Sequence, residues 1–182
     1  VRDSKGIIPS FGVYFSLFFV QYYTLLSSRF KHYMLEKENQ NGKQDLVSLS
    51  QYSSYLTFKR ILSSWEWKEI VEPEVDTKED QLHGLVAVLM ALGWGALEIL
   101  ELIPEKELIV GVSDSSEANS YLREYGQTET AQCDMLQGAM GALMDLLYAE
   151  DYPRGCYTFS TLEKCCRAKG DSYCEFISWR EL

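Results

Sequence analysis

The sequence predicts an α+β fold, with N-terminal helices packed on a small antiparallel sheet made of two hairpins separated by a helix. Two observations predict it. Apolar residues recur at helical spacing in the N-terminal half and again over 132–148, and alternating apolar residues flank turn residues in 96–113 and 157–179. The chain has 182 residues and no internal repeat, so we expect a single domain over 1–182.

The first predicted helix begins after Pro9, with Ser10 as its N-cap, and runs to about Lys37. Its segment Phe11–Leu26 is rich in aromatic side chains and carries no charge. Such a segment is predicted to be buried nearly all round, in the core or at a subunit interface. Residues 1–80 are therefore the expected helical dimerisation part. The segment is shorter than the ~20 mostly apolar residues of a spanning helix, so no membrane span is expected.

Further helices and the first hairpin follow. Apolar residues at helical spacing predict one or two helices over 46–67 and another over 80–92, with an acidic, proline-containing loop at 69–80 between them. Trp94, which lies between two glycines, follows the end of the helix at 80–92. The first hairpin is expected as a strand, a turn and a strand over 96–102, 104–106 and 107–113.

Another helix separates this hairpin from the last one. Residues 115–125 form a polar connection with helical character, and 132–148 is a helix whose internal glycines give it a thin face for close packing. The last hairpin is expected over 157–179, around a tight polar turn centred on Gly170. Both hairpins are predicted to join in one antiparallel sheet.

Composition and motifs argue against several classes of function. The formal net charge is -10 and there is no basic run, so direct binding of nucleic acid is not expected. The sequence has no nucleophile elbow, phosphate-binding glycine loop, zinc-protease motif or paired catalytic carboxylates. Its histidines are His32 and His83, both far from the cysteines in sequence. No catalytic residue is predicted, and the chain is not expected to be an enzyme.

All five cysteines lie in the C-terminal part of the chain: Cys133, Cys156, Cys165, Cys166 and Cys174. An odd count with two adjacent cysteines is unlike a secreted disulfide framework and favours the reducing cytoplasm. If Gly170 centres the last turn, Cys166 and Cys174 are opposed, with Cβ atoms ~5 Å apart. Cys165 then points to the other face of its strand.

Four residues of this region are candidate zinc ligands: Cys133, Glu163, Cys166 and Cys174. Cys133 starts a helix, where the helix dipole favours a thiolate. A bend near the entry of the strand would bring Glu163 to the same place. Three sulfurs and a carboxylate form a closed set, which is typical of structural zinc. The alternative, buried free cysteines without metal, stays open on spacing alone, and Cys156 and Cys165 are left outside the site.

The same region resembles the 4-vinyl reductase (4VR) domain, the ligand-sensing domain of phenol- and xylene-responsive activators, whose fold is shared with TRAPP vesicle-tethering subunits. The resemblance covers about 82–179. It rests on Gln132-Cys133-Asp134-Met135-Leu136-Gln137-Gly138, on Glu163-x-x-Cys166 and on Ala168-x-Gly170-Asp171-x-x-Cys174-x-Phe176. It implies that Cys133, Glu163, Cys166 and Cys174 bind a structural zinc ion.

The resemblance also implies a function: a cytoplasmic sensor domain that binds a small hydrophobic molecule between helices and sheet and signals to a regulatory protein partner. Trp94 is the candidate ligand-binding residue. It is not at the place of the phenol-binding tryptophan, and no histidine matches the phenol-binding one, so the specificity does not transfer. The alternative is a TRAPP-like homodimeric scaffold without ligand. An accessory role in tetrapyrrole reduction follows from the family's name alone, because no nicotinamide or flavin fingerprint is present.

Overall fold

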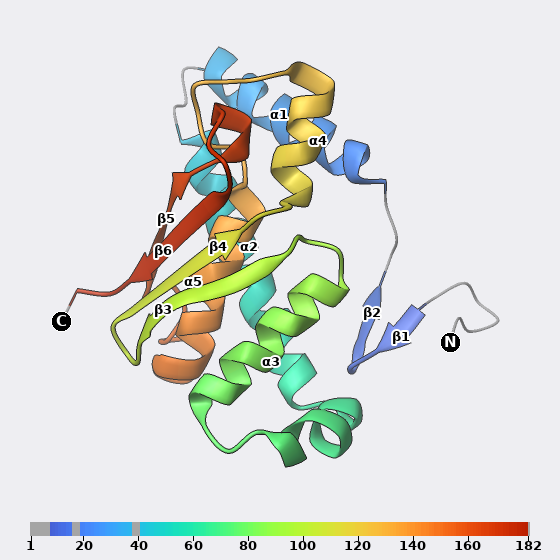
Figure 1. Ribbon diagram of the computed structural model, residues 1–182, viewed down its shortest axis with the longest axis vertical. Coiled ribbons are helices and arrows are strands. Elements are labelled where there is room, and N and C mark those ends of the chain that lie inside the picture. The colour runs from blue at the N-terminus through green and yellow to red at the C-terminus, as the bar shows by residue number, and fades with distance from the viewer. Residues whose placement is uncertain (1–7, 16–18, 38–40, 182) are drawn as a thin grey trace.

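The computed structural model describes residues 8–15, 19–37 and 41–181. Figure 1 shows an α+β molecule whose main antiparallel sheet has four strands in the order β3-β4-β6-β5. The strands are β3 (Leu97–Ile103), β4 (Glu107–Val112), β5 (Ser160–Cys165) and β6 (Cys174–Trp179). The two predicted hairpins therefore join along β4 and β6, where Val110 pairs with Phe176. The predicted fold class is confirmed.

The central helix of the molecule is α5 (Asp134–Tyr148), in which every residue except Met135 and Leu146 is buried. It packs against the sheet on one side and against α2 (Gly42–Leu62) on the other. A Cβ atom on Gly138 would lie 2.4 Å from the carbonyl oxygen of Val47 in α2. The predicted thin face of this helix is confirmed, and it lets the backbones of α5 and α2 come close together.

The connection at 115–125 is a full helix, α4 (Ser116–Tyr125). Helix α3 (Lys78–Ala91) starts before the expected position because Thr77 and Asp80 form a capping box. The Asp80 N–H donates to Thr77 Oγ1 at 3.1 Å, and the Thr77 N–H donates to the Asp80 carboxylate at 2.9 Å. The stretch predicted as a loop before α3 contains two helical turns instead, η1 (Trp67–Val71) and η2 (Glu72–Glu74), and Trp67 is buried there.

The start of the chain differs most from the prediction. A small hairpin, β1 (Ile8–Ser10) and β2 (Val13–Phe15), replaces the first turns of the expected helix. Phe11 and Gly12 form its turn with φ of 49° and 67°, the positive values that match the twist of paired strands. Ser10 is thus a strand residue, and its prediction as an N-cap is wrong.

Helix α1 (Val20–Glu36) begins after Phe19 and ends close to the predicted position, while residues 16–18 of the predicted helix lie outside the described residues. The prediction that this helix is buried nearly all round is wrong within this chain. Of the described residues of α1, Thr24 alone is buried. Helix α1 contacts α2 and α4 along one side, and the rest of it faces outward. We call four of its exposed apolar residues the outer face of α1: Tyr22, Leu25, Leu26 and Tyr33.

The helices of the described residues differ in length and in apolar content. None of them, over the residues that the structure describes, is both long enough and apolar enough to cross a bilayer.

Candidate metal centre

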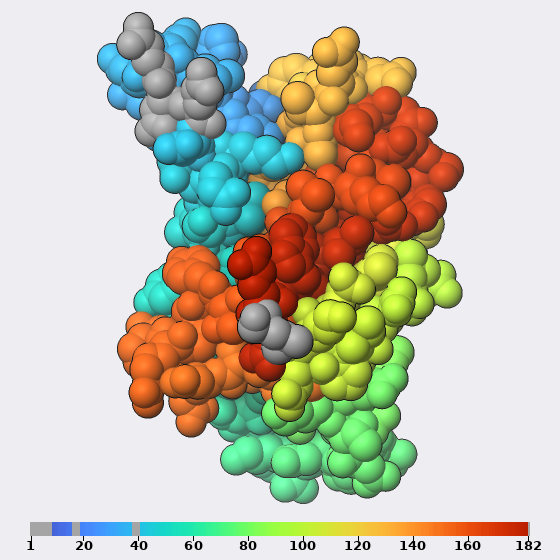
Figure 2. All heavy atoms as spheres, turned by 90° about the vertical axis from the view of Figure 1, so that its left-hand side faces the viewer, coloured from blue at the N-terminus to red at the C-terminus, as the bar shows by residue number. Residues whose placement is uncertain are grey.

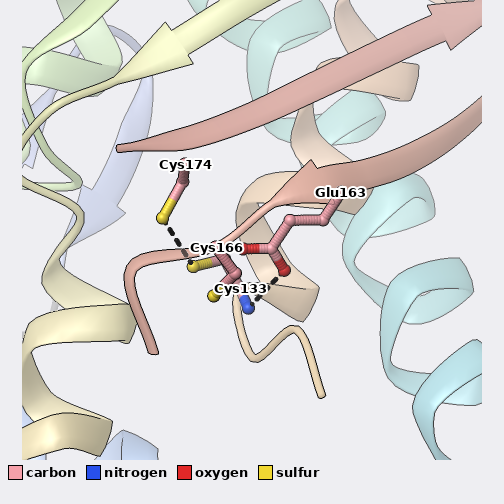
Figure 3. A group of neighbouring side chains, drawn as sticks. All are labelled: Cys133, Glu163, Cys166 and Cys174. Atoms are coloured by element: carbon pink, nitrogen blue, oxygen red, sulfur yellow. Dashed lines mark hydrogen bonds between the residues drawn. The ribbon is translucent and has the colours of Figure 1, made fainter. Parts of the chain in front are cut away.

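The structure brings together the four residues that the sequence nominated: Cys133, Glu163, Cys166 and Cys174. All are buried, and one ligand atom from each lies within 4.8 Å of the others. Figure 3 shows their side chains converging beneath the second hairpin, where the start of α5 meets it. The cluster therefore links one helix to one hairpin through side chains that are far apart in sequence.

A β-bulge explains how Glu163 and Cys166 reach the same side of their strand. Residues three apart on a regular strand point to opposite faces. Here Glu163 pairs with Phe176 and Cys165 pairs with Glu175, so Lys164 is an extra residue that restores a common face. The predicted bend is confirmed. Cys165 points outward and is partly exposed, outside the cluster.

The predicted tight turn at Gly170 is wrong in detail. Strand β5 ends at Cys165, and the helical turn η3 (Arg167–Lys169) leads into Gly170, which adopts a φ of 101°. The backbone of Cys166 holds this loop: its N–H donates to the Asp171 carboxylate at 2.7 Å, and its carbonyl accepts from the Lys169 N–H at 2.8 Å. The longer connection still leaves Cys166 and Cys174 close together, because Cys165 pairs with Glu175, the pair next to them that the predicted register requires.

The distances fit a metal better than a disulfide. The Cys133 and Cys174 sulfurs are 3.7 Å apart, whereas a disulfide is about 2.05 Å long. A tetrahedron with Zn–S bonds of about 2.3 Å has an edge of about 3.8 Å. Glu163 Oε2 accepts the Cys133 N–H at 2.9 Å, and the buried Oε1 has no hydrogen-bond partner among the residues that the structure describes. A buried acceptor without a partner is costly, and a cation beside the three sulfurs would satisfy it.

The protonation of the cluster is set by burial and by the close packing of its thiols. Contacts from the Cys133 and Cys174 thiols lower the pKa of Cys166. The contact with Cys166 in turn raises the pKa of Cys133. For Cys174, the contact with Cys133 lowers the pKa, but Cys166 and burial raise it more, to about 12. Burial, followed by the charge of Cys166, raises the pKa of Glu163 to about 8. Metal binding would displace the retained protons.

Groups around the cluster supply further polar contacts. Ser115 Oγ lies 3.2 Å from the Cys133 sulfur, and the Arg167 N–H donates to the Cys174 sulfur at 3.4 Å. The charged end of Arg167 turns away and donates to Asn119 at 2.6 Å. Lys164 pairs with Glu175 at 2.9 Å on the outer side of the sheet. These nearby cations are thus engaged elsewhere, and backbone and hydroxyl groups contact the sulfurs instead.

A second polar cluster at the start of α5 was not predicted. The buried Glu117 carboxylate accepts the N–H groups of Met135 and Leu136 at 3.2 and 2.9 Å, so it caps α5 from α4. Asp134 binds Lys31 of α1 at 2.7 Å. Burial, followed by the charge of Asp134, raises the pKa of Glu117 to about 8. No local pattern identifies Glu117, since its partners lie on another helix.

Two surface grooves flank α4. The first, the α3/α4 groove, has a volume of ≈ 440 Å³ and lies where α1 begins, α3 ends and β3 starts; Gly93, Gly95 and Ala96 line it together with Asn119 and Arg123. The second, the α1/α4 groove, has a volume of ≈ 490 Å³ and lies between α4 and the C-terminal half of α1.

The remaining predicted residues lie apart from the metal cluster. Trp94 is half-buried against Tyr23, edge to face at 6.3 Å, while the glycines on either side of it line the α3/α4 groove. His83 is exposed on α3, and His32 is exposed on α1, paired with Glu36 at 3.2 Å. Cys156 is half-buried in the loop after α5.

Comparison with known proteins shows a shared fold. No protein family and no curated protein matches the sequence. The phenol-responsive sensory domain of the transcription activator PoxR, with phenol, matches with a TM-score of 0.70 over 97% of this chain and 81% of that chain, at 12% sequence identity. A trafficking protein particle complex subunit 3 from Naegleria fowleri, covalently bound to palmitic acid, matches with a TM-score of 0.59 over 90% of this chain and 95% of that chain, at 9% identity.

Proposed function

We propose that this chain is a zinc-containing sensor domain of the 4VR type, which binds a small molecule and signals to a protein partner. The observation that carries the proposal is the buried set of three cysteines and one glutamate, whose ligand atoms lie within 4.8 Å of one another. The fold shared with a phenol-responsive sensory domain supports it. A cytoplasmic setting, in which the thiols stay reduced, belongs to the same proposal.

Zinc would have a structural role here and not a catalytic one. Three thiolates and a carboxylate fill a tetrahedral site, so no position remains for a reacting water. The ligands come from the residue before α5 and from both sides of the second hairpin, so the ion would hold helix and hairpin together. Neither similar solved structure is named as an enzyme, which agrees with a binding role.

The ligand would bind in the α3/α4 groove. This groove lies between helices and the first hairpin, where the sequence predicted the ligand, and its volume of ≈ 440 Å³ is in the usual range for small-molecule sites. Val20 and Met90 give it apolar walls, while Asn119 and Arg123 add polar groups. A small molecule with an apolar body and several polar groups fits this lining, which also includes Gln21, Asp114 and two serines. Trp94 would contact it if the indole turned from Tyr23.

One experiment tests the zinc proposal directly. The protein is purified without chelator from cells grown in zinc-containing medium, and its metal content is measured by native and elemental mass spectrometry. We expect one zinc ion per chain, lost together with thermal stability when a strong chelator is added. Full-length protein that carries no metal, takes up none and unfolds at the same temperature with chelator would refute the proposal.

The outer face of α1 favours a second candidate function, a TRAPP-like homodimeric scaffold. Its side chains include Leu26 and Tyr33, which are 54% and 55% exposed. Exposed apolar side chains on one face of a helix are suited to a protein interface, and a second copy of α1 would cover them. Light scattering separates the outcomes: a scaffold is a dimer without ligand, and a monomer would contradict both the scaffold and dimerisation of the sensor.

A further inference from the structure

The α1/α4 groove differs in charge from the rest of this acidic chain. The whole sequence has 27 acidic and 17 basic residues apart from histidine. The described residues that line the groove include Arg29, Lys31 and His32, and none of them is acidic. In Figure 2, α1 (blue) and α4 (yellow) stand on either side of a depression at the top of the molecule. A basic depression on an acidic surface attracts anions.

The positive charge in the groove is not fully used by protein carboxylates. Asp134 lies beneath it and is shared by Lys31 at 2.7 Å and Lys43 at 3.5 Å. Glu117, close to this pair, is already engaged, because its carboxylate accepts the N–H groups of Met135 and Leu136. Among the described residues, Arg29 takes part in no ion pair and is exposed. Its guanidinium can therefore hold an external carboxylate through two parallel hydrogen bonds.

The opposite wall of the groove is aromatic. Tyr121 and Tyr125 of α4 pack with ring centroids 5.1 Å apart and an interplanar angle of 44°. Tyr125 is 46% exposed, so its ring presents a surface for a flat, apolar body. Gln132 at the floor is fixed, because its carbonyl oxygen accepts from Lys31 at 2.8 Å and its amide donates to Thr130 at 2.7 Å. A ligand that fits this groove would therefore have a negative charge on the α1 side and a flat apolar ring on the α4 side.

We propose that the α1/α4 groove is a second ligand site that binds a small aromatic carboxylate, with its carboxylate on Arg29 and its ring against Tyr121 and Tyr125. The volume of ≈ 490 Å³ accommodates one such molecule. The site lies beside the metal cluster, because Lys31 binds Gln132 and Asp134, the two neighbours of Cys133. Even so, the proposal does not require the zinc ion.

Benzoate is the probe, and calorimetric titration at low salt is the measurement. We expect saturable binding of benzoate, at least about tenfold tighter than that of benzamide, which has the same ring without the charge. Arg29→Gln should weaken benzoate binding at least about tenfold, and Arg29→Lys should retain more of it. Arg60→Gln removes the same charge from an exposed position on α2 and should change the affinity less than about twofold.

Further results test where the ring and the carboxylate of the ligand lie in the groove. Tyr125→Ala should weaken benzoate about threefold to tenfold through lost ring contact, with an unchanged thermal unfolding curve as evidence of folding. Equal binding of benzoate and benzamide, equal effects of Arg29→Gln and Arg60→Gln, or no saturation by benzoate would overturn the carboxylate site. Wild-type affinity in Tyr125→Ala would overturn the aromatic wall. Because benzoate binding is read directly, this test can fail while zinc content and binding in the α3/α4 groove stand, and the reverse also holds.

Discussion

Replacing Cys166 by serine should weaken zinc binding at the proposed metal site, and Cys165→Ser is its matched control. The two cysteines are adjacent, yet Cys166 is buried in the four-residue cluster and Cys165 points away from it, partly exposed. Any effect of mutating this stretch of backbone is shared by both variants. A difference between them therefore reports on the metal site.

The expected magnitude follows from the closed ligand set. Structural zinc sites in small domains bind with about 10–16 kcal/mol in total. Divided among four ligands, this gives about 2.5–4 kcal/mol for each, or roughly 10²- to 10³-fold in zinc affinity. Serine oxygen is a poor substitute for a thiolate at neutral pH, so Cys166→Ser should lose most of that contribution.

Competition with a chromophoric zinc chelator measures the change. We expect wild type and Cys165→Ser to hold zinc equally well against the chelator. Cys166→Ser should lose its zinc at a chelator concentration that is at least roughly 10²-fold lower. Thermal unfolding in excess zinc should follow the same order. Equal zinc affinity in the two variants, or a loss in Cys165→Ser instead, would refute the assignment of the ligands.

Three further predictions concern packing, pH and assembly. Gly138→Ala should destabilise the protein by about 1–3 kcal/mol or more in denaturant titrations, because the added methyl group would meet the α2 backbone at 2.4 Å. Gly126→Ala is its control, since a Cβ atom there has open space. This control measures the strain of a positive φ without the clash, and it should lower the free energy of unfolding less. Burial raises the pKa of Glu117 in the folded state to about 8, against an ordinary value of 4.5, so above pH 4.5 the unfolded state releases a proton that the folded state retains. Glu117 therefore lowers stability between pH 4.5 and 8 by up to about 1.4 kcal/mol per pH unit, and Glu117→Gln should show a flatter pH dependence; an unchanged slope would contradict the raised pKa. If the chain forms the proposed dimer through α1, Leu26→Glu on the outer face of α1 should convert it to a monomer in light scattering. Leu162→Glu, at a similarly exposed residue of β5, should leave the dimer intact, and dissociation by both variants or by neither would contradict this interface.

Local sequence patterns predicted much of this fold. The hairpin at β3 and β4 follows from alternating apolar residues around a short turn, and α5 follows from apolar spacing with small residues on one face. Both patterns depend on neighbours within a few positions. The prediction of one continuous helix at the N-terminus was wrong because it also relied on a local pattern alone. An aromatic-rich run carries no clear period, and the two-residue turn at Phe11 and Gly12 was hidden inside it.

The candidate metal site was also accessible from the sequence, because strand register decides which cysteines share a face. Register placed Cys166 and Cys174 together and turned Cys165 away. The bulge at Lys164 could be expected only as an unspecified bend. In contrast, the cap of α5 by Glu117 joins residues 19 positions apart on different helices, and no short-range pattern encodes it.

The sequence by itself determined the fold class and the elements of the C-terminal part, since these follow from local periodicity. It also nominated the four candidate zinc ligands, through strand register for Cys166 and Cys174, the helix start for Cys133, and an expected bend together with the family resemblance for Glu163. The tertiary structure decided where α1 lies, which of its faces stays exposed, and how α4 divides the surface into two grooves of different charge. Those features arise from the packing of segments distant in the chain. Their geometry depends on side-chain contacts among α1, α4 and α5, which no local pattern specifies.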